Sequence, residues 1–290
     1  MFIPVFDIHT ISGLAVYAAR NEAQLKHMNE PAPGIFIAET ANVVLRALQS
    51  GYEPESMLLE KRFTEASTDS EDETERTVAE ILTYMKEVPV YTATLDEISA
   101  VSGFKQTRGV LCAMKRRELP PLAEVLKEAC RIAVLEDVEN PTNVGAIFRS
   151  AAALGIDAVV LTYRCVDPLY RRASRVSMGG VFRIPWTYAG NKHAGWPGPL
   201  LDELKNAGFE TVAMALSDQA VSLADPSLKN IEKLAVFFGN EENGLCEDTL
   251  RRIDHTAIIP MMHEMDSLNV AAAAAVTFWE LCGSKTTEKA

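Results

Sequence analysis

The chain has 290 residues, of which 48% are hydrophobic and 23% are charged. These values are typical of a globular protein with one large domain or two smaller ones. The net charge of −12 argues against a generally basic nucleic-acid coat protein, although it leaves room for an enzyme with one local basic patch.

The first part of the chain alternates between apolar strands and amphipathic helices. Val44, Leu45 and Leu48 recur at helical spacing, and Gly51 follows at a position where glycine often ends a helix. The expected elements are strands at Gly34–Ala38, Ser56–Leu59, Val88–Thr92 and Val110–Met114, and helices at Ala41–Gln49, Thr74–Lys86 and Leu95–Val101. They predict a small α/β domain within residues 1–118.

A basic cluster followed by two prolines then interrupts the pattern. Pro120 and Pro121 come shortly after Lys115–Arg117, so we expect residues 119–128 to be a linker. Residues 129–290 restart the alternation and are expected to form a second domain. Its expected elements are strands at Arg131–Leu135, Ala158–Thr162, Thr211–Leu216, Leu234–Gly239 and Thr256–Met261, and helices at Val144–Leu154, Leu200–Asn206 and Leu268–Cys282.

Repeated strand–helix units with short connections predict a mostly parallel sheet with helices on both faces. Ligands bind such sheets beyond the carboxyl ends of the strands. The five cysteines are scattered and include no C-x-x-C, so we expect reduced thiols and no metal site. No secretory signal or membrane span is visible, and we therefore expect a cytoplasmic protein without membrane contact.

Two residues stand out in the segment that runs from the strand at Arg131–Leu135 into the next helix. Asn143 lies near the expected helix start and has an ordinary interpretation as a helix N-cap. Arg149 is less easily explained by structure alone, because its neighbours one turn away are all small: Gly145, Ala146, Ala152 and Ala153. A large ligand or another backbone can approach that face closely, so we interpret Arg149 as functional.

Two further polar segments follow buried strands later in the chain: one runs from Gly239 to Gly244, and the other leads to Ser267 and Asn269. Gly239-Asn240-Glu241 leads to Gly244, and glycines at both ends of a turn permit close approach of a ligand to the backbone. Ser267 has a simple interpretation as the cap of the last helix. Asn269 would lie in that helix's first turn, where asparagine is a poor helix former, and its presence there indicates a role.

An arginine-rich segment is the strongest candidate for an RNA or phosphate contact. Five arginines and one acidic residue lie between Arg164 and Arg183. This local reversal of charge in an acidic chain is typical of a surface that binds phosphates. A solvated loop is the alternative interpretation.

The three polar segments together resemble the three motifs of the SpoU (TrmH-like) RNA ribose 2′-O-methyltransferases, within the SPOUT class. The matching segments are Asn143-x-Gly145…Arg149, Gly239-Asn-Glu241-x-x-Gly244-Leu, and Ile259-Pro-Met…Ser267-Leu-Asn269-Val. The resemblance covers about residues 131–282, and residues 34–118 resemble more loosely the family's small N-terminal substrate-binding domain. It implies S-adenosylmethionine as methyl donor, a C-terminal deep trefoil knot, and a homodimer that completes the site.

The resemblance also assigns roles to single residues. The adenosine of the donor is expected to contact Leu216, Gly239, Ile259 and Leu268. Arg149 is expected to stabilise the developing alkoxide, since a guanidinium pKa above ~12 makes it a poor base, and Glu241 would orient it. Ser267 and Asn269 would position the ribose, Asn143 the motif-one turn or a phosphate, and the RNA would contact Arg171, Arg172 and Arg175.

Two departures from the family pattern leave an alternative open. The family usually has Gly at the position of His263 and often Ser at that of Ala271, and His adopts positive φ less readily than Gly. These departures favour, as an alternative, an RNA-binding or ribosome-associated factor that kept the fold and lost catalysis. A small-molecule α/β enzyme is a third interpretation, but it leaves the arginine-rich segment unexplained.

Overall fold

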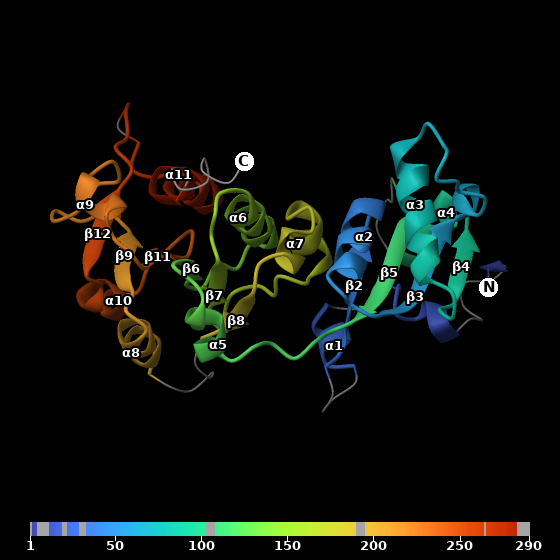
Figure 1. Cartoon of the computed structure of the whole chain (residues 1–290), viewed down its shortest axis with the longest axis horizontal. Coiled ribbons are helices and arrows are strands. Elements are labelled where there is room, and N and C mark those ends of the chain that lie inside the picture. The colour runs from blue at the N-terminus through green and yellow to red at the C-terminus, as the bar shows by residue number, and fades with distance from the viewer. Residues whose placement is uncertain are drawn as a thin grey trace. The chain divides into compact units, whose positions relative to one another are not determined.

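The computed structural model describes residues 2–4, 12–18, 22–28, 33–102, 108–189, 195–263 and 265–282. The chain divides into two compact units, seen in Figure 1. The first unit comprises Met1–Glu118 and Leu169–Phe182, and the second comprises Leu119–Pro168 and Arg183–Ala290. Within the described part of the chain, no helix combines the length and the apolarity needed to cross a membrane.

The first unit is a five-stranded mixed sheet in the order β1-β4-β3-β5-β2. Strands β1 and β3 run parallel to β4, whereas β5 runs antiparallel to β3 and β2. The strands are β1 (Phe2–Pro4), β2 (Ile35–Glu39), β3 (Pro54–Glu60), β4 (Val90–Ala93) and β5 (Val110–Lys115). The helices are η1 (Ser12–Leu14), α1 (Glu22–Lys26), α2 (Ala41–Gln49), η2 (Lys61–Phe63), α3 (Glu73–Tyr84), α4 (Leu95–Ser102), α7 (Arg171–Val176) and η3 (Gly180–Phe182).

The expected elements of this unit are all present, with shifts of one or two residues at most ends. Gly51 has a φ of 78°, which is the left-handed conformation that glycine adopts readily at the end of a helix. The segment Leu169–Phe182 was not expected here. Helix α7 packs against β2, and the ring of Phe182 lies 5.8 Å from that of Phe36 and 5.2 Å from that of Tyr52.

The second unit is a seven-stranded sheet in the order β10-β12-β9-β11-β6-β7-β8. All neighbouring strands are parallel, as the strand–helix alternation predicts. The strands are β6 (Arg131–Leu135), β7 (Ala158–Leu161), β8 (Trp186–Tyr188), β9 (Glu210–Met214), β10 (Val221–Ser222), β11 (Leu234–Phe238) and β12 (His255–Ile258). The helices are α5 (Leu122–Lys127), α6 (Pro141–Ala153), α8 (Gly198–Asn206), α9 (Pro226–Lys229), α10 (Glu247–Arg252) and α11 (Val270–Cys282).

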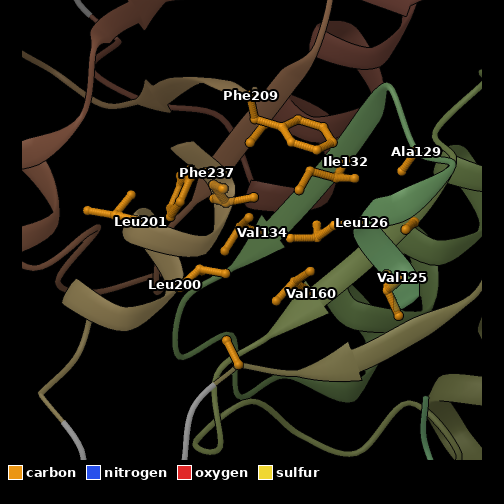
Figure 2. Close-up of a cluster of buried hydrophobic side chains, with 14 of the residues drawn as sticks. Val125, Leu126, Ala129, Ile132, Val134, Val160, Leu200, Leu201, Phe209 and Phe237 are labelled. Carbon is orange, nitrogen blue, oxygen red and sulfur yellow. The ribbon is translucent and has the colours of Figure 1, made fainter. Parts of the chain in front are cut away.

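Helices cover both faces of this sheet, and the central strands are buried throughout. Figure 2 shows one face, where side chains of α5 and α8 meet those of β6, β7 and β11. Successive strand residues point to opposite faces, so Phe237 joins this cluster. The adjacent Phe238 meets Phe278 of α11 edge-on at 5.6 Å on the other face, where α11 also packs against α6 (Figure 1).

The segment that we expected to be a linker belongs to the second unit. Residues 119–121 lead into α5, whose Val125 and Leu126 are buried in the cluster of Figure 2. The two prolines suggested a break, but Pro121 stands at the N-cap of α5, a place where proline is tolerated because the first helical amides lack partners anyway.

The strand order decides which loops become neighbours. Because all seven strands are parallel, their carboxyl ends lie at the same edge of the sheet. Strand β9 lies between β12 and β11, and β6 lies next to β11. The segments that follow β9, β11 and β12 therefore come together at one place, although they are far apart in the sequence.

Candidate functional site

A pocket of about 620 Å³ lies at this edge of the second unit. It is formed by the segments after β9, β11 and β12 and by the start of α11. The lining residues are Met214, Ala215, Leu216, Phe238, Gly239, Asn240, Glu241, Glu242, Asn243, Gly244, Leu245, Leu250, Ala257, Ile258, Ile259, Met261, Asp266, Ser267, Leu268, Asn269, Val270 and Ala273.

All four residues expected to contact the methyl donor line this pocket: Leu216, Gly239, Ile259 and Leu268. Each lies within two residues of the end of a strand or of the start of α11. The side chains of Leu216 and Leu268 are 67% and 42% exposed, although apolar side chains usually become buried. The pocket therefore offers apolar surface to a ligand.

The loop after β11 closes on itself around two glycines. Asn240 N donates to Gly244 O at 3.0 Å, and Gly244 N donates to Asn240 O at 2.9 Å. A Cβ at Gly239 would lie only 2.2 Å from the carbonyl carbon of Gly244, a distance that side chains do not reach. Gly239 is thus required by the close approach of the two ends of the loop, and Gly244 by its φ of 66°.

Three of the expected polar residues form a chain of hydrogen bonds beside the pocket. Asn269 Nδ2 donates to Asn143 Oδ1 at 3.1 Å. Asn143 Nδ2 in turn donates to Glu241 Oε1 at 2.5 Å. Glu241 and Asn269, which lie 98 and 126 positions from Asn143 in sequence, are therefore fixed relative to one another, and Asn143, which is buried, is the link between them.

Neither Asn143 nor Ser267 caps a helix in the structure, and other residues cap α6 and α11. Asn140 is the N-cap of α6, with Oδ1 accepting from Thr142 N at 2.8 Å. At the start of α11, Asn269 Oδ1 accepts from Ala271 N at 3.0 Å. Asn143 is therefore available to reach Glu241, and Asn269 both caps its helix and donates to Asn143.

Arg149 lies outside the pocket, on the exposed side of α6. Among the described residues it makes no hydrogen bond or ion pair. Ala152 and Ala153 beside it are also exposed, whereas Gly145 is buried and Ala146 is partly buried, so only the C-terminal half of the small-residue face is open to solvent. We expected Glu241 to orient Arg149, but in this structure the hydrogen bond of Glu241 goes to Asn143.

The arginines expected to bind RNA belong to the first unit. Arg175 Nη1 lies 2.7 Å from Glu39 Oε1, and the backbone amide of Arg171 donates to Glu22 Oε1 at 2.9 Å. Arg172 is exposed on α7. The sequence pattern found the local excess of positive charge, but it did not indicate that part of this charge is balanced within the fold.

One buried thiol lies close to the start of the motif-one segment. Burial raises the pKa of Cys165 to about 11, so this side chain is a neutral thiol near pH 7. It donates to Leu135 O at 3.2 Å and accepts from Val138 N at 3.3 Å. Cys165 therefore fastens the end of β6 and is not a nucleophile.

Comparison with known proteins identifies the family to which the chain belongs. The model of the SpoU rRNA methylase family matches residues 131–279, just over half of the chain. A Mycobacterium tuberculosis protein named as an uncharacterized tRNA/rRNA methyltransferase is 39% identical over 249 residues, which are 85% of this chain and 80% of that protein. The chain belongs to the SpoU rRNA methylase family. It is accordingly an RNA methyltransferase.

Other relatives of this SpoU methylase have more specific names. The 23S rRNA (guanosine(2553)-2′-O)-methyltransferase RlmP of Bacillus subtilis is 30% identical over 198 residues, which cover 68% of this chain and 73% of RlmP. The structure of an AdoMet-bound rRNA methyltransferase from Sinorhizobium meliloti has the same fold, with a TM-score of 0.77 at 22% identity, covering 97% of each chain.

The departure at His263 is accommodated without a change of backbone class. His263 adopts a φ of 56°, in the left-handed region where a glycine would be at ease. Ala271 is buried, and its amide is the group that Asn269 caps. The two departures leave the chain from Asn269 through Asn143 to Glu241 intact in this SpoU methylase.

Sequence reasoning assigned no role to four polar residues of the pocket, namely Asn240, Glu242, Asn243 and Asp266. Asn240 accepts from the amides of Glu242 and Asn243 and donates from Nδ2 to Asp137 O at 2.8 Å. Asp266 lines the pocket beside Ser267. A signal for Asn240 was present, because asparagine side chains commonly stabilise turns, but no periodicity singles out Asp266.

Proposed function

We propose that the chain transfers a methyl group from S-adenosylmethionine to a ribose 2′-OH of ribosomal or transfer RNA. The observation that carries this proposal is the hydrogen-bonded chain of Asn269, Asn143 and Glu241 beside a pocket that all four expected donor-binding residues line. The printed name of RlmP, a 2′-O-methyltransferase, supports the ribose as the methylated group.

The pocket residues fit S-adenosylmethionine. A volume of about 620 Å³ lies within the ~300–1,000 Å³ usual for pockets that bind cofactor-sized ligands. Leu216, Ile259 and Leu268 supply apolar contacts for an adenine ring. Glu241 and Asp266 supply negative charge for a molecule that carries a sulfonium and an ammonium group.

The bound donor supplies an electrophilic methyl group, and the protein's task is to orient the hydroxyl and stabilise charge. We assign Arg149 to the developing alkoxide, because an always-charged planar donor set suits an oxyanion better than a proton-transfer role. The proton passes to a phosphate or to water. Glu241 uses Oε1 to hold Asn143 and keeps Oε2 for Arg149 when the substrate is bound.

The other motif residues would act on the substrate side of the same pocket. Ser267 and Asn269 lie at the start of α11 and are exposed, which suits contacts to a ribose. Asn143 is buried, so its role is to hold Glu241 and Asn269 in place. Positioning of this kind contributes to catalysis by limiting the motion of the reacting groups.

We assign RNA contacts to Arg171, Arg172 and Arg175 in the first unit, which would serve as the RNA-binding domain. Arg172 is exposed, and the Arg175 side chain is 47% exposed even though it pairs with Glu39. Replacing Arg172 with Ala is expected to weaken RNA binding. The slope of log K against log salt concentration should become less steep by about the release of one counterion. An unchanged salt slope would assign the contact to another surface.

We further propose a homodimer formed by the second unit, a deep trefoil knot within that unit, and a cytoplasmic location. Val276 and Trp279, three positions apart on α11, are 41% and 68% exposed, as expected for a face that a second copy covers. The knot rests on the family resemblance, and the packing of α11 on α6 is compatible with it. Mechanical unfolding by pulling on both termini tests the knot. The end-to-end length of the unfolded chain should stay shorter than that of a fully extended chain of the same number of residues, because the tightened knot retains part of the chain.

The decisive experiment is methylation of isolated ribosomal and transfer RNA with isotope-labelled donor, followed by nuclease digestion and mass spectrometry. The expected product is a single 2′-O-methylated nucleoside. A methylated base would refute the ribose assignment. Donor binding and RNA binding without any transfer would instead support the alternative, a binding factor that has lost catalysis.

A further inference from the structure

Glu136 is a buried carboxylate to which the mechanism above gives no role. It follows β6 directly, and only 4% of its surface is exposed. Its backbone amide donates to Phe238 O at 2.8 Å, so Glu136 lies beside the end of β11. The pocket loop begins at Gly239, the first residue after that strand.

The carboxylate of Glu136 binds the other end of the same loop. Oε1 accepts from Cys246 N at 2.7 Å, and Oε2 accepts from Thr249 Oγ1 at 2.7 Å. Thr249 is fully buried. Within the described residues Glu136 has no ion pair, so its charge is balanced by hydrogen bonds from neutral groups alone. Such burial is costly, and that cost points to a role for these two contacts.

The segment between these contacts is the wall of the pocket. Every residue from Gly239 to Leu245 lines it. The first part of the loop is held by Asn240, which donates to the carbonyl oxygen of Asp137 at 2.8 Å. Glu136 and Asp137, two consecutive residues after β6, therefore fasten the pocket loop at both of its ends.

We propose that Glu136 is a positioning residue for the methyl donor. It fixes Gly244 and Leu245 as a preformed wall, so that donor binding does not have to order the loop. Preorganisation of this kind increases affinity by lowering the entropic cost of binding. The inference deepens the proposed function, on which it rests for the identity of the ligand.

The structure also indicates which kinetic constant Glu136 should affect. Glu241, the residue assigned to catalysis in this loop, is held separately by Asn143 of α6. Loss of the Glu136 contacts should loosen the 244–249 part of the loop while Glu241 stays in place. The expected change is a higher KM for the donor with little change in kcat once the donor is saturating.

The test compares Glu136→Ala with Glu136→Gln and Thr249→Val in the full-length chain. Calorimetry with S-adenosylmethionine is expected to show about tenfold weaker binding for Glu136→Ala, which corresponds to ~1.4 kcal/mol, and about threefold weaker binding for Thr249→Val. Glu136→Gln should stay within about threefold of the unaltered chain, because its amide oxygen can accept from Cys246 N while its amide nitrogen donates to Thr249.

Asp254, which is exposed where Glu136 is buried, offers a control with the same types of donor away from the pocket. Its Oδ2 accepts from Thr211 N at 2.9 Å and from Thr211 Oγ1 at 2.7 Å, the same pair of donor types, but near the start of β9. Asp254→Ala should lower thermal stability and leave donor affinity unchanged. Equal loss of affinity in Asp254→Ala and Glu136→Ala would reduce Glu136 to a general stabilising role.

Amide hydrogen exchange supplies a readout that does not depend on the ligand. Exchange across residues 244–249 should accelerate in Glu136→Ala and remain slow in Asp254→Ala. Unchanged exchange together with unchanged affinity in Glu136→Ala would overturn the inference. If the unaltered chain bound no S-adenosylmethionine, the proposed function would be wrong, while the exchange data would still decide whether Glu136 orders the loop.

Discussion

Arg149 and Asn143 are both polar residues of α6, but they differ in burial and in hydrogen-bond partners. Asn143 is buried and bonded at both ends of its amide. Arg149 is exposed, and among the described residues it has no ion pair or hydrogen bond. A buried amide with fixed partners orders a site, whereas an exposed guanidinium without partners is available to the substrate.

Arg149→Ala is expected to lower kcat by at least about 10²-fold, because it removes the group assigned to the developing charge. Donor affinity should stay within a few-fold, since Arg149 does not line the pocket. Single-turnover methylation and calorimetry measure the two effects separately. Arg149→Lys should fail as well, because a point charge does not replace a planar set of donors. Normal turnover, or loss of donor binding as the main defect, would contradict the assignment.

His263 adopts a left-handed backbone conformation that is unfavourable for most residues with a side chain. Its φ of 56° is tolerated by His but costs most for β-branched residues. His263→Val is therefore expected to reduce the free energy of unfolding by about 1 kcal/mol. His263→Gly should be neutral or slightly stabilising, because the relief of strain outweighs the entropy that glycine loses on folding. Urea unfolding of both variants checks this, and equal stability of the two would count against strain at this position.

At the scale of elements, α11 begins with a residue that has two tasks. Asn269 caps the helix through Oδ1 and donates to Asn143 through Nδ2. The cap fixes where α11 starts, and the second contact ties that start to α6. The end of the pocket formed by Ser267 and Leu268 is therefore placed by the helix that follows it.

The two tasks of Asn269 are separable by substitution. Asn269→Ser keeps a good N-cap but is too short to reach Asn143, so stability should change by less than about 0.5 kcal/mol while methyl transfer falls at least about tenfold. Asn269→Ala loses the cap as well and should cost about 1 kcal/mol. Thermal unfolding and initial methylation rates test the pair. If Asn269→Ser kept full activity, the contact to Asn143 would have no catalytic role.

At the scale of the whole molecule, the chain first passes from one unit to the other between residues 118 and 119, and the segment Leu169–Phe182 returns to the first unit. A fragment of residues 119–290 retains α5, whereas one of residues 129–290 loses Val125 and Leu126 from the core in Figure 2. Burying two such side chains contributes at least about 3 kcal/mol. The shorter fragment is expected to be less stable by that amount in urea unfolding. Equal stability would show that α5 packs only loosely.

Trp279 tests the proposed dimer in the full-length chain. Its side chain is 68% exposed, so Trp279→Glu should leave the fold of one subunit intact while placing a charge in an apolar interface. Light scattering should then report a monomer. Tyr84→Glu on α3, where Tyr84 is 44% exposed, is the matched control and should leave the mass unchanged. A dimer that survives Trp279→Glu would place the interface elsewhere.

The sequence by itself predicted the main strands and helices of both units and their order, although it missed short elements such as α5, α7, β8 and α10. Apolar periodicity and helix-ending glycines are local signals, and they predicted β6 and α2 at their observed ends. The family resemblance implied Leu216, Gly239, Ile259 and Leu268 as donor contacts, and the structure places all four at one pocket, at the edge where the carboxyl ends of the parallel strands lie.

Only the tertiary structure decided which side chains meet. The sequence pattern did not reveal that Asn143 binds Glu241 and Asn269, that Glu136 fastens Cys246, or that Arg175 pairs with Glu39. Each of these contacts joins residues separated by more than ninety positions. Their meeting depends on strand order and helix packing, which are set by the whole hydrophobic core and not by any local stretch of sequence.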